Sequence, residues 1–201
     1  MPSPLIEASD FVVVDVETTG MHPVNDRVTE IAMFRVRNGQ ITDEFSTLVN
    51  PLMTIPAFIT DMTGIDNVMV ADAPTAREVS PYVAEFLAES VFVAHNVGFD
   101  WGFVKEMLRR ERNIELSAPR LCTVKLSQRI LSTLPSKSLG PVTRALGITI
   151  PHRHRASGDA YATAQVLIQF LRYLEDRLAL TTLEEVLRFQ YKSSPLLTDQ
   201  P

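Results

Sequence analysis

Two acidic residues follow an apolar run near the start of the chain, in the segment FVVVDVETTG at residues 11–20. The apolar run is rich in β-branched side chains, which is typical of a strand buried on both faces of an α/β sheet. Because side chains alternate along a strand, Asp15 and Glu17 point to the same side, about 6–7 Å apart. Two neighbouring carboxylates beside a core repel each other unless a cation or a shared proton relieves them. The segment therefore predicts a central strand that carries half of a metal site.

The length of 201 residues suits one domain with a single core, and the hydrophobic content of 45% is ordinary for a globular protein. The sequence has no apolar run long enough for a membrane span and no secretion signal at its start. The single cysteine, Cys122, excludes an internal disulfide, so we expect a cytoplasmic protein. We expect a flexible lead at residues 1–9, the main domain at 10–178, and a short helix with a tail at 179–201.

The net charge of −5 argues against a protein that coats nucleic acid through a broad basic surface. It leaves open a protein that holds a few phosphates through metal ions and a local basic rim. The charge therefore excludes one way of binding nucleic acid and not the others.

The first third of the chain predicts three antiparallel strands in sequence. The second strand is expected at residues 27–36 and the third at residues 41–49, where Pro51 ends it. The dipeptide Asn38-Gly39 lies between them and is a strong signal for a type I′ hairpin.

A buried strand at residues 91–94 follows a predicted helix that begins near residues 72–75. A strand, a crossover helix and another strand predict that residues 91–94 lie parallel to the first strand. The residues after both strands then meet at one sheet edge, where open α/β sheets hold their ligands. Asp15 and Glu17 should therefore lie near Asn96 and Asp100.

The remaining segments predict one more strand and several helices. We expect a short helix at 56–61, a helix opened by Asp100, a strand at 120–123, and helices at 124–131, 139–146, 157–176 and 183–189. Ser157 is the expected N-cap of the long helix, whose small residues would let it approach the sheet closely. Asp159 then falls in the first turn, where the helix dipole favours a carboxylate.

Asp15, Glu17, Asp100 and Asp159 form a set of carboxylates without a cysteine or histidine cluster. Such a set suits a hard ion such as Mg²⁺ or Mn²⁺. Two such ions about 4 Å apart stabilise the attacking and leaving oxygens of a phosphodiester displacement. His154 precedes Asp159 by five residues, and a neutral histidine there would take a proton from the attacking water.

Each of these residues has a simpler interpretation when it is taken alone. The acidic pair would cap a turn, Asp100 would start a helix, and His154 would be a solvated surface histidine. Their joint spacing favours the catalytic interpretation. His95 and Glu30 lack such support, so we expect a structural role for His95 and a surface or hydrogen-bonded role for Glu30. The basic cluster at residues 105–112 is expected to be a solvated helix face.

Three motifs resemble, in order, those of the DEDDh family of 3′-5′ exonucleases. They are DVETTG at residues 15–20, HNVGFD at residues 95–100, and His154 with four residues between it and Asp159. The pattern, over about residues 10–175, is similar to that of the proofreading epsilon subunit of bacterial DNA polymerase III. The resemblance implies an RNase H-like α/β fold with a central mixed five-stranded sheet, three antiparallel strands then parallel strands, flanked by helices.

The resemblance also implies roles for individual residues. Asp15 would bridge two metal ions, Glu17 and Asp159 would hold the ion that activates water, Asp100 would serve the second ion, and His154 would be the general base. Six residues would contact the substrate: Thr18, Thr19, Gly20, Ile65, Asn96 and Phe99. Among them, the Thr18 backbone would touch the terminal nucleotide, and Ile65, expected to be exposed in a turn, would wedge against the last base. Asn96 would contact phosphate or support the site.

We therefore expect a 3′→5′ exonuclease that uses two Mg²⁺ ions, with Mn²⁺ as a substitute, and releases nucleoside monophosphates from single-stranded or frayed DNA. Two alternatives stay open: an RNA 3′ exonuclease and a catalytically silent nucleic-acid-binding module. A polymerase or repair partner also stays open. Residues 190–197 match a clamp-binding peptide poorly, which argues against membership of a replisome.

Overall fold

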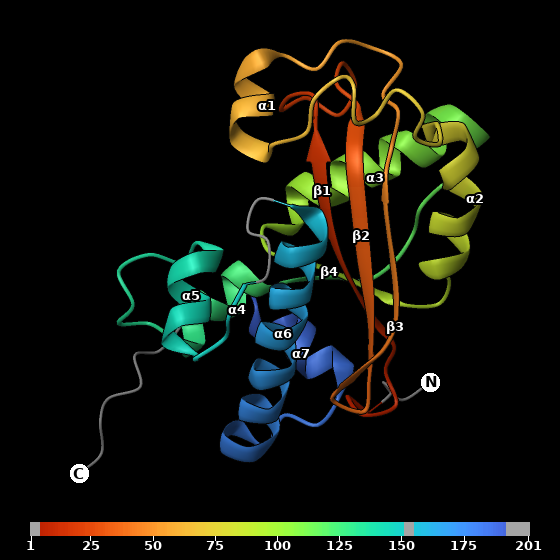
Figure 1. Ribbon diagram of the computed structural model, residues 1–201. Helices are drawn as coiled ribbons and strands as arrows, with labels where there is room; N and C mark the ends of the chain where they lie inside the picture. Colours follow the sequence, from red (N-terminus) through yellow and green to blue (C-terminus); the bar gives the residue numbers. More distant parts are fainter. Residues whose placement is uncertain (1–4, 151–154, 192–201) are drawn as a thin grey trace.

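A mixed five-stranded sheet with helices on both faces forms the centre of the computed structural model, which describes residues 5–150 and 155–191 (Figure 1). The strand order is β3-β2-β1-β4-β5. The strands are β1 (Phe11–Thr18), β2 (Val28–Arg37), β3 (Gln40–Leu48), β4 (Val91–Ala94) and β5 (Arg120–Cys122). β2 is antiparallel to β1 and β3, whereas β4 is parallel to β1 and β5. The predicted RNase H-like arrangement of strands is confirmed.

The hairpin between β2 and β3 turns at Asn38 and Gly39, whose φ angles are +50° and +66°. Positive φ at both central residues is the requirement of a type I′ turn, which twists with its strands. The predicted turn is therefore confirmed, although the flanking strands extend one residue closer to it than expected.

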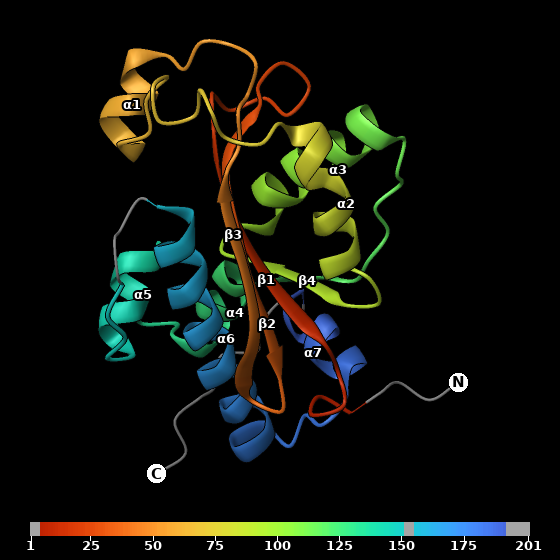
Figure 2. The ribbon, with the colours of Figure 1, turned by 45° about the vertical axis from the view of Figure 1, so that its right-hand side comes forward.

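Seven helices lie in the described part of the chain. They are α1 (Ala57–Thr63), α2 (Ala76–Phe86), α3 (Val97–Arg112), α4 (Thr123–Ile130), α5 (Leu139–Ala145), α6 (Ala156–Leu178) and α7 (Leu183–Phe189). Figure 2 shows α2 and α3 on one face of the sheet and α6, with α4 and α5, on the other. None of these helices in residues 5–150 and 155–191 is long and apolar enough to cross a membrane.

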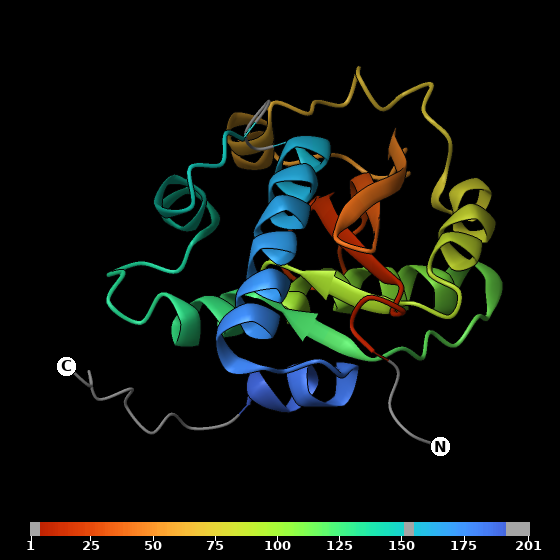
Figure 3. The ribbon, with the colours of Figure 1, turned by 90° about the horizontal axis from the view of Figure 1, so that it is seen from below.

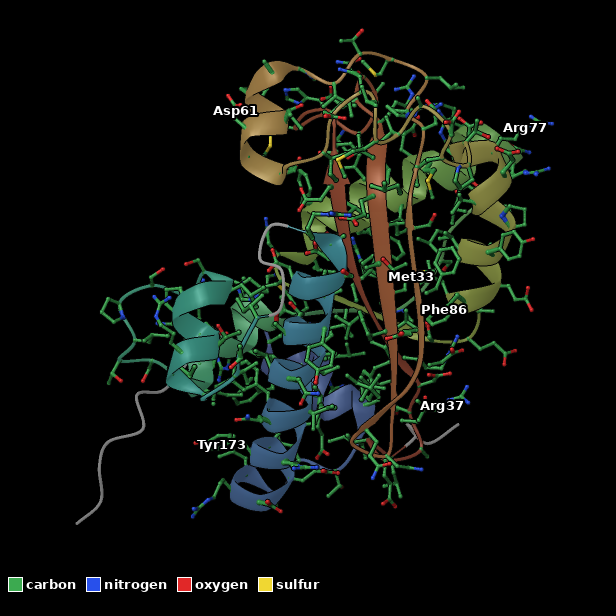
Figure 4. All side chains as sticks on the ribbon, in the orientation of Figure 1. Met33, Arg37, Asp61, Arg77, Phe86 and Tyr173 are labelled. Carbon is green, nitrogen blue, oxygen red and sulfur yellow. The ribbon has the colours of Figure 1, made fainter. Side chains whose placement is uncertain are left out.

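The alternation of side chains along β1 supplies both cores. Phe11 and Val13 pack into the core that contains α6, whereas Val12 and Val14 pack into the core that contains α2 and α3. All four side chains are at most 1% exposed. In the second core, Met33 of β2 lies on the face that α2 covers (Figure 4). The prediction of a strand buried on both faces is confirmed.

Two helix starts differ from the prediction. α3 begins at Val97, because Asn96 adopts a left-handed backbone (φ +82°) that turns the chain out of β4, so Asp100 lies in the first turn. α6 begins at Ala156 with Arg155 as the N-cap residue, not at Ser157. The cause is tertiary: a carboxylate from β2, that of Glu30, accepts a hydrogen bond from the Ala156 amide at 2.8 Å.

The two ends of the described chain pack onto the main domain. Residues 5–9 are not a loose lead, because Ile6 is only 4% exposed and its amide donates to the Thr181 carbonyl at 2.9 Å. At the other end of the described chain, Gln190 is also bound to the main domain. The Gln190 side chain accepts from the Cys122 amide (3.0 Å) and donates to the Arg120 carbonyl (2.8 Å). Both ends thereby cover one end of the molecule, where Figure 3 shows α7 below β4 and β5.

Candidate active site

Three carboxylates converge where β1 ends and α6 begins. One oxygen atom from each of Asp15, Glu17 and Asp159 lies within 4.8 Å of the other two. Asp15 and Glu17 project from the same side of β1, as the alternation predicts, and Asp159 lies in the first turn of α6. The structure therefore brings together three of the four predicted metal ligands from positions more than 140 residues apart.

Small residues allow α6 to approach the sheet at this point. Ala156, Ala160 and Ala164 are fully buried in the core beneath β1 and β2. Larger side chains at these positions would hold the helix axis further away, since packing distance follows the size of the contacting side chains. The close approach predicted from these residues is confirmed, and it carries Asp159 to the acidic pair.

Burial and mutual repulsion favour the protonated forms of these carboxyl groups when no metal ion is bound. Burial raises the pKa of Asp15 well above its ordinary value, and the charges of Asp100 and Glu17 add to the shift. Burial, followed by repulsion from Glu30, raises the pKa of Glu17 to about 8. A divalent cation would relieve the same repulsion, and oxygen ligands are those that hard cations prefer. These residues therefore fit a hard divalent metal ion.

Asp100 lies beside this cluster and is not a member of it. Its side chain is buried, and its Oδ1 atom accepts a hydrogen bond from the Val16 amide at 3.2 Å. Burial raises the pKa of Asp100 to about 7, although backbone hydrogen bonds act in the opposite direction. This hydrogen bond joins the start of α3 to β1. It also places Asp100 near Asp15, and the charge of Asp100 raises the pKa of Asp15.

The side chains of the turn after β1 are used to build the turn. The Thr18 hydroxyl donates to the Gly20 carbonyl at 2.6 Å, and the Thr19 hydroxyl accepts from the Arg27 amide at 3.0 Å. A Cβ atom on Gly20 would lie 2.5 Å from a carboxylate oxygen of Asp26, which packs directly against the glycine. The Thr18 and Thr19 side chains thus have structural partners, and the contact of the Thr18 backbone with a nucleotide stays a prediction.

Helix α3 holds the same turn from outside. Arg110 donates to the carbonyls of Pro23 (2.9 Å) and Val24 (3.1 Å), and Arg109 pairs with Glu106 at 2.7 Å. The basic residues at the end of α3 therefore bind groups of the protein itself. The predicted solvated face is therefore only partly solvated, because Arg110 is held against the turn after β1.

The prediction that Ile65 is exposed is wrong. Ile65 is 0% exposed and packs in a small separate core, whose other buried members are Ile55, Ile59 and Val70. The reason is the end of α1, where Gly64 takes a left-handed backbone (φ +72°) and turns the next side chain inward. The exposed apolar side chains of this helix are Phe58 and Met62, at 64% and 54%. Ile65 therefore cannot wedge against a base from this position.

Asn96 and Phe99, the remaining predicted substrate residues, lie at the start of α3. Asn96 is exposed. The ring of Phe99 is half-buried, and its centroid lies 4.9 Å from that of Phe103. Both residues lie in the chain between the end of β4 and Asp100, and their contact with a substrate stays a prediction.

His95 has a structural role, as expected. Its Nδ1 atom is 2.9 Å from the Thr123 hydroxyl, and its Nε2 atom is 2.9 Å from the Lys137 carbonyl. Burial lowers the pKa of His95 to about 4. A neutral ring with both nitrogen atoms occupied joins the end of β4 to the loop before α5 and has no nitrogen left for catalysis.

His154, the predicted general base, lies outside the described residues, as does His152. The chain is described again from Arg155, the next residue after His154. The role of His154 therefore stays a prediction from sequence.

The pairing of Glu30 with Arg155 is the part of this region that the sequence did not predict. Glu30 is buried on β2, and Arg155 grips both of its carboxylate oxygens, at 2.6 Å from Nη2 and 3.1 Å from Nε. The hydrogen-bonded role expected for Glu30 is confirmed, but its partner was missed. The hairpin register was the available signal, because it pairs Glu30 with Glu17 and so places it at the site.

Comparison with known proteins agrees with this geometry. Residues 12–167 match the model of the RNase T family, which is described as exonuclease. A DNA polymerase III PolC-type protein of Caldanaerobacter subterraneus subsp. tengcongensis is 39% identical over 83% of this chain, which spans 12% of that protein. A DNA polymerase III subunit epsilon of Aquifex aeolicus is 37% identical over 82% of this chain and 81% of its own length.

Solved structures show the same fold. Exonuclease X in complex with 5′ overhanging duplex DNA has a TM-score of 0.71 and 27% sequence identity, over 90% of this chain and 99% of that one. The PolC-type relatives are much longer, so this chain corresponds to about an eighth of them.

Proposed function

This chain belongs to the RNase T exonuclease family, and we propose that it is a metal-dependent 3′→5′ exonuclease. Its substrate in this proposal is single-stranded or frayed DNA, from which it releases nucleoside monophosphates. The observation that carries the proposal is the convergence of Asp15, Glu17 and Asp159 within 4.8 Å. The choice of DNA is supported by the similar exonuclease whose structure holds DNA and by relatives that are named as DNA polymerase III proteins.

Asp15, Glu17 and Asp159 would hold divalent ions, with Asp100 serving a second ion from beside Asp15. We propose two Mg²⁺ ions, for which Mn²⁺ can substitute. Ions at such a site supply positive charge that offsets the negative charge developing on a phosphodiester during cleavage. The raised pKa values of these carboxylates support this assignment, because burial and then mutual repulsion disfavour their charged forms unless a cation is bound.

His154 is the proposed general base. It would take a proton from the attacking water, whose oxygen forms a bond to phosphorus as the bond from phosphorus to the 3′ oxygen breaks. The shortened strand keeps the 3′ oxygen, which takes a proton from solvent to become the new 3′ hydroxyl, and the released nucleotide carries a 5′ phosphate. The backbone of Thr18 and the side chains of Asn96 and Phe99 would position the terminal nucleotide.

A replicative polymerase is the partner that we propose. The support is that the relatives include a PolC-type polymerase and an epsilon subunit. In the PolC-type proteins, this chain corresponds to a small part of a much larger protein.

The test uses 5′-labelled single-stranded DNA and RNA of the same sequence, with Mg²⁺ or with a chelator. We expect a ladder that shortens from the 3′ end, faster for DNA, and that disappears with the chelator. His154→Ala should lower the rate by about 10²–10⁴-fold, whereas the control His152→Ala should leave it nearly unchanged. Faster shortening of RNA would contradict the substrate, and binding without cleavage of either strand would contradict the activity.

A further inference from the structure

Glu30 and Arg155 lie immediately behind the acidic cluster without belonging to it. Glu30 is on β2 opposite Glu17 of β1, and its side chain is 4% exposed. The Arg155 side chain comes from the segment that enters α6 and is 35% exposed. A buried carboxylate and a guanidinium in this fork geometry form one of the stronger hydrogen-bonded pairs in proteins.

The same carboxylate also begins the helix. Glu30 Oε2 accepts from the Ala156 amide at 2.8 Å while it accepts from Arg155 Nε at 3.1 Å. The first amides of a helix have no partner within the helix, and Arg155 provides no side-chain cap to them. Glu30 therefore acts as an N-terminal cap of α6 that comes from strand β2, and it fixes both the position and the direction of the first turn of the helix.

That first turn carries one of the carboxylates of the site. Asp159 follows Ala156 by three residues, and its amide donates to the Arg155 carbonyl at 3.1 Å. On the other side, Arg155 follows His154 directly in the chain. Glu30 of β2 thus holds the helical turn that carries a proposed metal ligand.

From this geometry we infer that Glu30 and Arg155 are positioning residues, which hold Asp159 in register with Asp15 and Glu17. The inference rests on the proposed function. Groups that orient metal ligands typically contribute about 10- to 100-fold to metal affinity or activity. We expect a loss of that size when the pair is broken, although neither residue touches the substrate.

The chain offers a matched control at the other end of β1. Asp10 lies just before that strand and pairs with Arg35 of β2 at 2.5 Å, with a side chain that is 18% exposed. Asp10→Asn removes a charge from a partly buried ion pair, as Glu30→Gln does, but far from α6. A difference in activity or metal binding between Glu30→Gln and Asp10→Asn therefore measures an effect on the acidic cluster and not the general cost of losing an ion pair.

The experiment compares Glu30→Gln, Arg155→Gln, the double variant, Arg155→Lys and Asp10→Asn. We expect kcat to fall by about 10- to 100-fold in the first three with little change in KM, and Mn²⁺ binding by titration calorimetry to weaken in parallel. The double variant should be no worse than either single variant, because the two residues act as one unit. Arg155→Lys should recover part of kcat, and Asp10→Asn should keep it.

Hydrogen exchange at the amides of residues 156–159 separates this inference from the proposed function. Faster exchange there in Glu30→Gln, with unchanged exchange in Asp10→Asn, supports positioning even if the chain cleaves no DNA. Unchanged exchange, or a kcat and Mn²⁺ affinity within twofold of the unmodified protein, would overturn the inference. Absence of metal-dependent cleavage by the unmodified protein would instead overturn the proposed function.

Discussion

Glu17 and Glu30 are direct neighbours across β1 and β2, yet their carboxylates have different partners. Glu30 is neutralised by Arg155 and by the first amide of α6, whereas an oxygen atom of Glu17 lies within 4.8 Å of oxygen atoms of Asp15 and Asp159. Like charges opposite each other in a sheet are destabilising. The Arg155 guanidinium compensates the charge of Glu30, whereas Glu17 lies in a cluster of carboxylates that favours a metal ion.

The acidic cluster should make the metal-free protein less stable as the pH rises. The pKa of Glu17 is raised to about 8, so the folded state binds a proton that the unfolded state has already lost. Its contribution to stability is complete below its ordinary pKa and is lost as the pH rises through about 8. We expect the free energy of unfolding in a chelator to fall between pH 6.5 and 8.5, as measured by urea denaturation.

Two controls make this pH dependence specific. Glu17→Gln should flatten the slope above pH 6.5, and Mg²⁺ should stabilise the unmodified protein more at pH 8.5 than at pH 6.5, because protons compete with the metal. A free energy of unfolding that rises over this range in the chelator would show that the cluster does not hold protons.

His95 should matter for stability and not for proton transfer. Its ring bonds Thr123 and Lys137, and burial lowers its pKa to about 4. His95→Ala should therefore cost about 1–3 kcal/mol of unfolding free energy, because buried partners lose their hydrogen bonds. At a temperature where the variant is folded, its pH–rate profile should keep the shape of the unmodified profile. Loss of one limb of that profile would assign His95 a catalytic role.

Gly20→Ala should be poorly tolerated because of Asp26. The new Cβ atom would lie 2.5 Å from the Asp26 carboxylate, so this side chain has to move and gives up its hydrogen bond from the His22 amide, which helps to build the turn after β1. Overpacking of this kind costs about 1–3 kcal/mol of stability, and the shift should also lower kcat. Gly98→Ala is the matched control, because a Cβ atom there meets nothing within 4 Å. Equal effects of the two substitutions on urea midpoints and kcat would contradict this account of the turn.

Ile65→Ala should behave as a core substitution. Ile65 is 0% exposed, so its truncation should cost about 2–4 kcal/mol of unfolding free energy. Met62→Ala, at a side chain that is 54% exposed, should change stability by less than about 0.5 kcal/mol. A small loss of stability in Ile65→Ala together with a large loss of DNA affinity would instead support the prediction from sequence that Ile65 is exposed and contacts the last base.

Local patterns account for the parts of the fold that could be predicted. The alternation in β1 fixed which residues face each core, and the hairpin followed from Asn38-Gly39 because only a type I′ turn uses both residues well. The predicted start of α7 at residue 183 is also decided locally, because Thr182 and Glu185 form a capping box. In each case the residues that decide the structure lie within a few positions of one another.

Long-range partners account for what could not be predicted. The start of α6 is set by Glu30, which is 126 residues away from Ala156, so a local N-cap rule chose Ser157 instead. Similarly, a turn with an apolar residue suggested an exposed Ile65, but the small core beneath α1 buries that side chain. The three clustered carboxylates were predicted because Asp15 and Glu17 lie near the end of a recognisable strand and Asp159 lies near the start of a helix.

The most direct test of the central claim is a Mn²⁺ titration with parallel turnover measurements on Asp15→Asn and Asp10→Asn. Asp15 is common to both proposed ions, so its variant should lose Mn²⁺ binding and turnover while it stays folded. Asp10→Asn removes a carboxylate at the opposite end of β1 and should keep both. Turnover of Asp15→Asn at the rate of the unmodified protein would contradict the metal-dependent mechanism.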